Sequence, residues 1–407
     1  MLRCTSALAL RCCAVARCTA VPTPTPVTLL SEGEQMLVET VRQFAGRVIK
    51  PRARTMDETG VMDKAFIKEL FGAGLMGIET PAEHGGGDMS FFSSILAIEE
   101  IARVDPSVSV CVDVHNTLVN NVFFRFASRE QQARFLPDLA SSCMGCFCLT
   151  EAESGSDAFA LKARAVKKGD RWVINGTKMY ITNGGHADIF LVMANVDPSK
   201  GYKGITCFVV DKRKSPGVHV GPPLNKLGIR ASSTVEINFE NCEVPEENVI
   251  GEVGKGYKIA IGTLNEGRIG IGAQMVGIAQ GAMDLVMPYL FQRKQFNTHL
   301  GDFQALQMQY AQCATNTWAA RLMVYNAARK KLRGEDFVKD AAMAKLFASQ
   351  VAEETASKAV EWAGGIGFTR DFGVERFYRD AKVGAIYEGT SIIQLQTIAK
   401  AIKKEYE

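Results

Sequence analysis

The stretch RWVINGTKMYITNGG, residues 171–185, is the clearest strand signal in a chain whose two ends are helical in pattern. Val, Ile, Tyr and Thr favour strands, and Asn175-Gly176 between two such arms is the strongest short signal for a β-hairpin. Further β-rich runs follow, separated by turn residues: DIFLVMANV (188–196), GITCFVVDK (204–212) and TVEINFENCEVP (234–245). Residues 146–255 are therefore expected to form a middle antiparallel β domain.

A helical domain is expected before this block, over residues 31–145. Ser31 and Glu34, three residues apart, form a capping box ahead of MLVETVRQFAGRVI (36–49), whose apolar residues recur every three or four positions. A second apolar helical run, FFSSILAIEEIARV, covers residues 91–104.

Long helices are expected again over residues 256–407. The stretches with wide apolar faces are IGIGAQMVGIAQGAMDLVMPYL (269–290), 304–333 and 337–363. Such faces suit a C-terminal four-helix bundle and an oligomer interface. Helices, then strands, then helices give an α+β fold in three blocks, which is inconsistent with the alternating strands and helices of a Rossmann fold.

The N-terminus carries the charge imbalance of the chain. The formal charge is +3, and residues 1–31 hold Arg3, Arg11 and Arg17 and no acid, so the rest of the chain is neutral. A neutral body gives no electrostatic reason to bind nucleic acid or an anionic membrane. No eighteen apolar residues run together, so no membrane span is expected. The Arg-spaced, acid-free residues 1–30 are typical of a mitochondrial transit peptide, which predicts a soluble matrix protein.

The cysteines and histidines give no metal or disulfide signal. Four of the eleven cysteines lie in the presumed leader, and the remaining seven are odd in number and irregularly spaced. Cys143, Cys146 and Cys148 have no second Cys or His pair that would complete a tetrahedral zinc site. The five histidines are scattered, so we expect neither a metal site nor imidazole chemistry.

Glycine-rich stretches could contact a ligand, although each has a simpler explanation. GEVGKGYK (251–258) could simply turn the chain into the next helix. EWAGGIGFTRDFGVERFYRD (361–380) could offer backbone N–H groups to a phosphate, or only cap a helix. CLTEAESGSD (148–157) concentrates donors that suit a polar ring system or a diphosphate, and a capped turn explains them nearly as well.

A single carboxylate poses a similar choice near the C-terminus. In AIYEGTSIIQLQ (385–396), Glu388 stands before a Gly-Thr-Ser turn and an amphipathic run. Acidic residues are favoured near helix N-termini, so Glu388 could be a helix-start carboxylate. The alternative is a catalytic base, which these twelve residues alone favour less.

Together these stretches resemble the acyl-CoA dehydrogenase family, flavoenzymes that place a double bond between Cα and Cβ of an acyl thioester. CLTEAESGSDAFA (148–160) matches the first family signature, and residues 361–380 match the second. YEGTS (387–391) matches the segment that holds the catalytic glutamate. The resemblance covers nearly the whole chain after the leader and implies that Glu388 is the base.

The resemblance also implies FAD as cofactor, an acyl-CoA substrate, an electron-transfer flavoprotein as acceptor, and a homotetramer. The implied FAD-binding residues are Phe147, Cys148, Leu149, Thr150, Ser156, Tyr180, Ile181, Thr182, Arg293, Gln304, Glu361, Gly364, Gly365, Thr390 and Ser391. The implied substrate-binding residues are Ser156, Tyr202, Tyr257, Asn265 and Arg268. Residues 361–365, Arg293 and Gln304 would reach FAD across a subunit interface.

This chain departs from the family pattern at two positions. Tyr180 stands where the family usually has Trp, which could change stacking on the flavin and packing against a redox partner. Asn297 stands where the family often has Gly, so a side chain at that turn could alter the backbone near the adenosine.

The substrate class also follows from the resemblance. Some branched-chain members place the base at the position of Gly267, so this chain follows the majority arrangement, which argues against an isovaleryl enzyme. The stretch 231–251, GYKGIT (201–206) and LNEGRIGIGAQ (264–274) most resemble short/branched-chain (2-methylacyl) dehydrogenases, with butyryl enzymes next.

Two other functions stay open at this point. An acyl-CoA oxidase shares the base and the flavin but reduces oxygen, and it usually has a longer C-terminal region than this chain shows after Glu388. A non-catalytic mitochondrial assembly paralogue would need no base at all.

Overall fold

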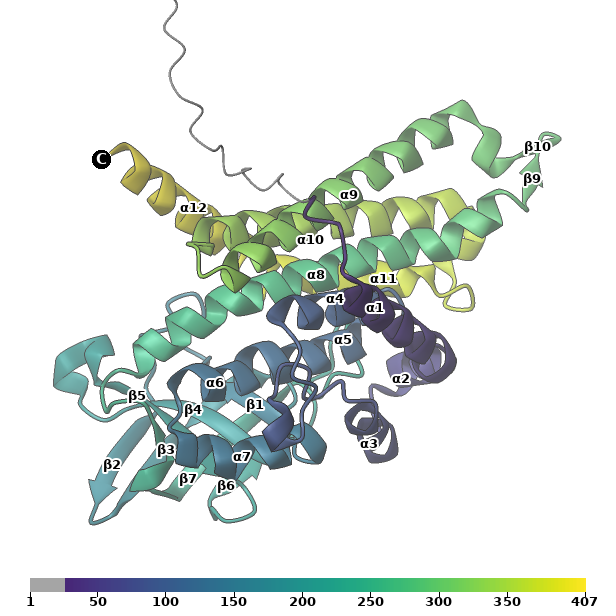
Figure 1. The fold of residues 1–407 in the computed structure, drawn as a ribbon. Helices are drawn as coiled ribbons and strands as arrows, with labels where there is room; N and C mark the ends of the chain where they lie inside the picture. Colours follow the sequence, from purple (N-terminus) through teal and green to yellow (C-terminus); the bar gives the residue numbers. More distant parts are fainter. Residues whose placement is uncertain (1–25) are drawn as a thin grey trace, which may run out of the picture.

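The computed structural model describes residues 26–407, so the transit peptide expected at residues 1–30 lies almost wholly outside the described residues. Helices and strands occur in three consecutive blocks (Figure 1). The N-terminal block contains α1 (Glu32–Phe44), α2 (Lys50–Thr59), α3 (Lys64–Gly72), α4 (Phe91–Ala102), α5 (Pro106–Asp113), α6 (Asn121–Phe126) and α7 (Arg129–Ser141). Two π-helical segments, η1 (Ala45–Ile49) and η3 (Val114–Asn120), join α1 to α2 and α5 to α6.

The capping box expected at the start of the first helix is confirmed. The Ser31 hydroxyl accepts a hydrogen bond from the Glu34 N–H at 3.3 Å, and the Glu34 carboxylate accepts one from the Ser31 N–H at 2.9 Å. These bonds satisfy two of the N–H groups that a helix start leaves unpaired.

The middle block is one eight-stranded sheet. Its strands are β1 (Gly145–Cys148), β2 (Arg164–Lys168), β3 (Arg171–Ile181), β4 (Ile189–Asn195), β5 (Ile205–Asp211), β6 (Val218–Val220), β7 (Val235–Pro245) and β8 (Val249–Ile250). The order is β6-β7-β3-β2-β4-β5-β8, with β1 also paired to β4. Most pairs are antiparallel, as expected, but β1 and β2 both run parallel to β4, so the sheet is mixed.

The hairpin predicted at Asn175-Gly176 is wrong. Strand β3 runs straight through these residues, and its register against β7 shifts between Ile174 and Gly176, which marks a β-bulge. Gly176 has a φ of 145°, and a Cβ there would lie 2.7 Å from Ala163. The true hairpin turn is the two-residue loop Gly169-Asp170 between β2 and β3. The sequence analysis therefore located the strand correctly but wrongly predicted a turn inside it.

The C-terminal block is built on four long helices. Its elements are α8 (Gly256–Leu290), β9 (Lys294–Gln295), β10 (Thr298–His299), α9 (Gln304–Leu332), α10 (Val338–Ala363), α11 (Val374–Ala381) and α12 (Ser391–Tyr406). The two-residue turn between β9 and β10 places Phe296 and Asn297 in the left-handed region, with φ of 51° and 61°. Asn tolerates this conformation, so the departure from Gly leaves a regular turn.

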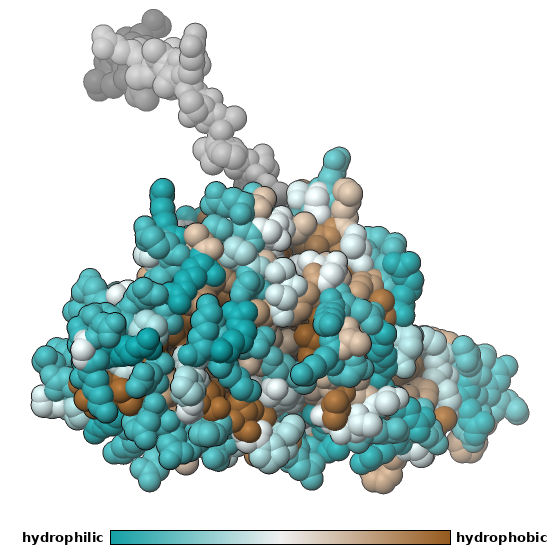
Figure 2. Space-filling model, turned by 90° about the horizontal axis from the view of Figure 1, so that it is seen from below, coloured by the Kyte–Doolittle hydropathy of each residue, from teal (hydrophilic) through white to brown (hydrophobic). Residues whose placement is uncertain are grey.

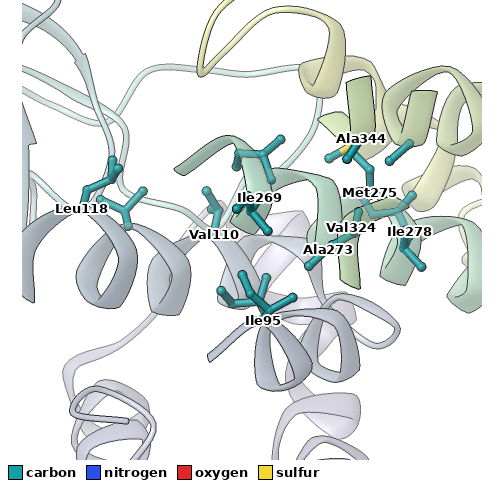
Figure 3. Close-up of a cluster of buried hydrophobic side chains, with 14 of the residues drawn as sticks. Ile95, Val110, Leu118, Ile269, Ala273, Met275, Ile278, Val324 and Ala344 are labelled. Atoms are coloured by element: carbon teal, nitrogen blue, oxygen red, sulfur yellow. The ribbon is translucent and has the colours of Figure 1, made fainter. Parts of the chain in front are cut away.

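Helix α8 is the spine of the molecule. It packs against α4 and α5 of the first block, β5 of the second, and α9, α10 and α11 of the third. Figure 3 shows the result: Ile95 and Val110 approach Ile269 from the N-terminal helices, while Val324 and Ala344 approach Met275 and Ile278 from the C-terminal ones. Among residues 26–407, α8 alone has the length and hydropathy of a membrane span, but 83% of its apolar window is buried inside the protein.

Exposed apolar side chains are distributed unevenly. On the face seen in Figure 2, hydrophobic residues lie in small spots between hydrophilic ones. Helices α9 and α12 carry larger exposed apolar side chains, among them Met308, Trp318, Ile392 and Leu395, which are 64%, 51%, 67% and 54% exposed. These two helices therefore present the apolar surface that the bundle leaves uncovered.

Candidate active site

Glu388 lies in a short connection between the 3-10 turn η8 (Lys382–Ala385) and α12. The cap of α12 is Thr390, whose hydroxyl accepts a hydrogen bond from the Ile393 N–H at 3.3 Å. Glu388 has a φ of 51°, which is unusual for a residue with a side chain, and Gly389 follows with 84°. Helix capping therefore does not account for Glu388, and its strained backbone must be held by other contacts.

Two buried side chains hold the backbone around Glu388. The Gln394 amide donates to the Glu388 carbonyl at 3.0 Å and to the Gly389 carbonyl at 2.8 Å. The Lys345 ammonium donates to the carbonyls of Gly384 and Gly389 at 2.6 and 2.8 Å. Gln394 and Lys345 are both fully buried, so these bonds are shielded from water.

The Glu388 carboxyl points at a bare stretch of α8. A Cβ on Gly267 would lie 2.8 Å from Glu388 Oε2 and 2.8 Å from Leu118 Cδ2, so only glycine leaves room there. Within the described part of the chain, Oε2 is buried and has no hydrogen-bond partner. Burial raises the pKa of Glu388 to about 7, against the positive charges of Lys345 and Arg268, which lower it. A carboxylate with this pKa is suited to take a proton at neutral pH.

Two charged groups complete the surroundings of this carboxyl. Arg268 donates to the Asn265 side chain at 2.9 Å, and burial lowers its pKa while the charge of Glu388 opposes that effect. Asp113 packs against Gly270, one turn beyond Gly267 on the same face of α8, where a Cβ would lie 2.1 Å from Oδ1. Burial raises the pKa of Asp113 well above its usual value, and the charge of Glu388 adds to this. The ionised Glu388 therefore disfavours ionisation of Asp113.

The ends of β1 and β3 bring a second group of predicted residues together. The Met179 N–H donates to the Thr150 carbonyl at 2.8 Å. The fully buried Lys178 donates to the Leu149 carbonyl at 3.0 Å and to the Glu151 carboxylate at 2.7 Å. This buried ion pair fixes the loop that follows β1 against β3.

This junction presents an aromatic ring between hydroxyl groups. Tyr180 is 63% exposed and has a φ of 58°, while Thr150 and Thr182 beside it are half-buried. The other predicted residues of these strands, Phe147, Cys148, Leu149 and Ile181, are buried beneath them. An exposed aromatic platform flanked by hydroxyl groups fits a planar ring system that carries polar atoms on its edge.

A pair of tyrosines lies near the start of α8. The rings of Tyr202 and Tyr257 meet edge to face with their centroids 5.0 Å apart. Ser156 is exposed in the loop after β1, and no described contact joins it to Glu388. Apart from Ser156, the predicted substrate residues thus form two groups: Arg268 lies near Glu388 and bonds Asn265, whereas Tyr257 near the start of α8 packs against Tyr202 in the 3-10 segment Pro198–Gly204.

Thr390 and Ser391 begin α12 close to Glu388, whereas the remaining predicted residues lie at the far end of the bundle. The exposed members are Arg293, Gln304, Glu361, Gly364 and Gly365. A hydrogen bond of 2.9 Å from the Trp362 indole to Gln309 ties the end of α10 to α9 at this point. Helix α8 rises about 1.5 Å per residue, so its end lies about 33 Å beyond Arg268. These residues therefore cannot contact the surroundings of Glu388 in the same chain.

Exposed glycines shape that distant cluster. Gly364 has a φ of 66°, and a Cβ at Gly364 or Gly365 would meet no atom within 4 Å. The backbone here is thus open to a ligand or to a second copy of the chain. The interpretation of residues 361–365 as a helix end is also correct, because α10 stops at Ala363.

Three residues around Glu388 were missed by sequence reasoning. Lys345 gave a signal, because it is a lone charge in the apolar run AAMAKLFAS. Gln394 stood in the quoted stretch after Glu388, but nothing showed that its side chain turns back. Asp113 stood among valines in SVCVDV. In each case the sequence contained an unexplained polar residue, and only the packing shows what it contacts.

Other polar features lie away from this site. A cavity of about 410 Å³ between α1, α2, α8 and α11 has walls that are mostly paired, as Arg103 with Asp284 at 2.6 Å. Across residues 26–407 no three His, Cys, Asp or Glu side chains gather as metal ligands would. The seven cysteines of that range are buried and free.

Comparison with known proteins identifies the class. Family models described as the N-terminal, middle and C-terminal domains of acyl-CoA dehydrogenase match residues 31–142, 146–242 and 254–403. The chain belongs to the acyl-CoA dehydrogenase family of FAD-dependent oxidoreductases, as its resemblance predicted.

Comparison with individual proteins adds to this family assignment. The chain is 53% identical over 381 residues to the short/branched chain specific acyl-CoA dehydrogenase, mitochondrial, of Rattus norvegicus, which covers 94% of this chain and 88% of that one. Its fold matches butyryl-CoA dehydrogenase from Megasphaera elsdenii with a TM-score of 0.90 and 39% identity, over 92% and 99% of the two chains. A structure described as the electron transferring flavoprotein of Acidaminococcus fermentans gives the same four values.

Proposed function

We propose that this protein is a mitochondrial matrix enzyme that oxidises short-chain or 2-methyl-branched acyl-CoA thioesters to 2-enoyl-CoA thioesters. FAD is its cofactor, and an electron-transfer flavoprotein is its electron acceptor. The observation that carries the proposal is the Glu388 carboxyl, buried without a partner on Oε2 and facing the bare backbone of Gly267. The rat relative, a mitochondrial short/branched chain specific acyl-CoA dehydrogenase, supports the location and the substrate class, and the Megasphaera butyryl-CoA dehydrogenase supports the substrate class.

Glu388 acts as the base that removes the α proton of the thioester. A free glutamate, with a pKa of about 4.3, is too weak for this task. Burial raises the pKa of Glu388 to about 7, so the carboxylate is both present and basic at neutral pH. The proton finishes on the carboxyl, in a space that Gly267 keeps open.

The backbone of Glu388 can stabilise the charge that develops on the substrate. In the described hydrogen bonds outside helices and strands, the Glu388 N–H is not a donor. Directed at the thioester carbonyl, such a donor contributes about 3 kcal/mol to the stability of the enolate. Lys345 and Gln394 fix the neighbouring carbonyls and so keep this N–H in one direction.

The residues present fit FAD at two places. The exposed ring of Tyr180, with Thr150 and Thr182, would hold the isoalloxazine, with Phe147, Cys148, Leu149 and Ile181 beneath. Residues Arg293, Gln304, Glu361, Gly364 and Gly365 would hold the adenosine end of FAD bound to a second copy, because they lie too far from Glu388 in their own chain. When bound, FAD supplies the acceptor for the hydride that leaves the β carbon.

Thr390 and Ser391 would lie near the FAD diphosphate. The Thr390 hydroxyl accepts from the Ile393 N–H, so its own proton stays available to an anionic oxygen. The α12 N-terminus adds a favourable dipole for such an anion.

The substrate would be held along α8. Tyr202 and Tyr257 would contact the CoA portion near the start of the helix, together with Ser156 from the loop after β1. Asn265 and Arg268 would contact the part nearest the reacting carbons. The Glu388 carboxyl fills the space beside Gly267, so the base of this chain comes from the connection before α12, as in most family members.

A homotetramer accounts for the apolar surface on α9 and α12 and for the distant FAD cluster. We also propose domain boundaries at residues 31–145, 146–255 and 256–407 after a transit peptide at 1–30. The start of β1 at Gly145 and of α8 at Gly256 supports these limits.

The purified protein should be yellow, and 2-methylbutyryl-CoA or butyryl-CoA should bleach its flavin absorbance without oxygen. The same test with isovaleryl-CoA should give slower bleaching. Peroxide released at the rate of substrate turnover in air would indicate an acyl-CoA oxidase instead. A colourless protein, or a yellow one that no short acyl-CoA bleaches, would contradict the proposal and revive the assembly paralogue.

A further inference from the structure

Lys345 is an unusual residue for the middle of a helix core. It lies in α10 and is fully buried, beside Ala344 and Ala348. A buried ammonium is unfavourable unless charges or acceptors compensate it. Yet no carboxylate within residues 26–407 forms an ion pair with it inside 4.0 Å, so carbonyl groups must supply the compensation.

The two carbonyls that accept from Lys345 bracket the connection that carries Glu388. Gly384 lies four residues before the base, and Gly389 directly after it. Ser349, one turn further along α10, also donates to the Gly384 carbonyl at 3.0 Å. A Cβ on Gly384 would lie 2.4 Å from Met275 Sδ, so this end of the connection is pressed onto α8 as well. The Lys345 ammonium thus joins the two ends of the connection, Gly384 and Gly389.

The titratable groups that face Glu388 come from four parts of the chain. Arg268 on α8 is positive and bonds Asn265, Asp113 lies at the end of α5 with its pKa raised by burial, and Tyr387 adjoins the base in the chain. Lys345 on α10 is the other positive group. Burial lowers the pKa of Lys345 to about 8, while the charge of Glu388 raises it and that of Arg268 lowers it further. The interaction between Lys345 and Glu388 is reciprocal, so the lysine favours the ionised carboxylate in return.

We propose that Lys345 is a positioning residue for the base: its ammonium anchors the Gly384 and Gly389 carbonyls on both sides of Glu388 and supplies positive charge that favours the carboxylate. This inference rests on the proposed role of Glu388. It assigns two separable effects to one side chain, a geometric one through hydrogen bonds and an electrostatic one through charge.

Two substitutions separate these effects in the FAD-loaded enzyme. Lys345→Gln keeps a donor of similar reach without the charge, and Lys345→Met keeps the length without donor or charge. The rate of anaerobic flavin bleaching by butyryl-CoA is measured from pH 6 to pH 9. Lys339→Gln, at a half-buried lysine of the same helix that pairs with Glu405, is the matched control.

Both variants should move the midpoint of the pH–rate profile upward by about one pH unit, because a positive neighbour is lost. The plateau rate at high pH should fall about tenfold in Lys345→Met. It should fall less in Lys345→Gln, whose side chain can still donate a hydrogen bond to one of the two carbonyls. The control should keep the wild-type profile. A profile that falls equally at every pH would assign Lys345 a purely structural role and overturn the proposal.

Failure of both variants to fold with bound FAD would also overturn it, because Lys345 would then serve the fold. The wild-type measurement keeps the two proposals apart. If no short acyl-CoA bleaches the wild-type flavin, the proposed function fails, whereas normal wild-type bleaching with an unmoved variant profile refutes only the role of Lys345.

Discussion

Replacing Glu388 by Gln should abolish activity and at the same time stabilise the protein at alkaline pH. Burial raises the pKa of Glu388 from 4.5 to about 7, so the folded state holds the proton more tightly than the unfolded chain. Ionising the folded carboxyl then destabilises the fold by ~3 kcal/mol at most. Glu388 Oε2 is buried but the residue as a whole is only half-buried, so solvent screens some of this, and we expect about 2 kcal/mol. The penalty is absent below pH 4.5, grows up to pH 7 and is constant above it.

Thermal unfolding of the yellow wild-type and variant proteins at pH 5 and pH 8 tests this reasoning. For a chain of this size, about 2 kcal/mol corresponds to a melting-temperature gain of roughly 2–3 °C at pH 8, and much less at pH 5. Activity should fall by a factor of about 10³ or more, because proton transfer alone contributes 10²–10⁴. A gain as large at pH 5 as at pH 8, or no gain at pH 8, would refute the argument from burial.

Glu34 offers a control of opposite sign. Burial raises its pKa, but hydrogen bonds from Arg329 and Ser31 outweigh this effect and hold the pKa below the usual value. The ionised form of Glu34 therefore stabilises the fold above its unfolded pKa, and that contribution is lost as the pH falls. Glu34→Gln should lower the melting temperature at pH 8 and have little effect in acid.

The remaining predictions concern α8, the pH profile and the distant cluster. Gly267→Ala should lower kcat/KM by about 10–100-fold, because the new methyl group displaces the Glu388 carboxyl, and it should leave stability unchanged or higher. Gly262→Ala, whose new methyl group meets nothing closer than 3.4 Å, should stay active. Equal rates for the two variants would refute the steric argument. The wild-type kcat/KM for butyryl-CoA should rise with pH through about 7 as Glu388 loses its proton, and a profile flat from pH 6 to pH 8 would contradict this base. Arg293→Ala should release FAD on dialysis faster than Lys294→Ala, with unchanged kcat when FAD is in excess, and equal retention would remove Arg293 from the cofactor site.

The fold could be predicted well where one local signal dominates. Capping residues and apolar periodicity placed the first helix, α9 and α10 to within a few residues, and the end of α8, which begins thirteen residues before its quoted apolar stretch. The failure at Asn175-Gly176 shows the limit, because a turn and a bulge need the same permissive backbone. Gly169-Asp170, a few residues earlier, carries an equally good turn signal. Which glycine turns the chain and which one bends a continuous strand is settled by the pairing of β3 with β7.

The candidate site was predictable only through the family motifs. From local pattern alone, a helix-start carboxylate was favoured over a base at Glu388. The contacts that distinguish these possibilities come from distant segments: Gly267 lies on α8, Lys345 on α10 and Asp113 at the end of α5. A pKa raised by burial is a property of that assembly, so no window of sequence around Glu388 contains it.

The face of α8 explains why the proposed base, Glu388, belongs to the C-terminal connection. Gly267 and Gly270, one turn apart, leave two recesses, and a carboxyl from another element occupies each: Glu388 in the first and Asp113 in the second. A side chain on Gly267 would fill the first recess, so a carboxylate at 267 and one at 388 exclude each other. A base can therefore lie either on α8 or on the connection. In this chain Lys345 and Gln394 hold the connection in the position in which the Glu388 carboxyl fills the recess. Restoring a side chain to the helix without removing the one at 388 should lower activity, because two groups would then compete for one space.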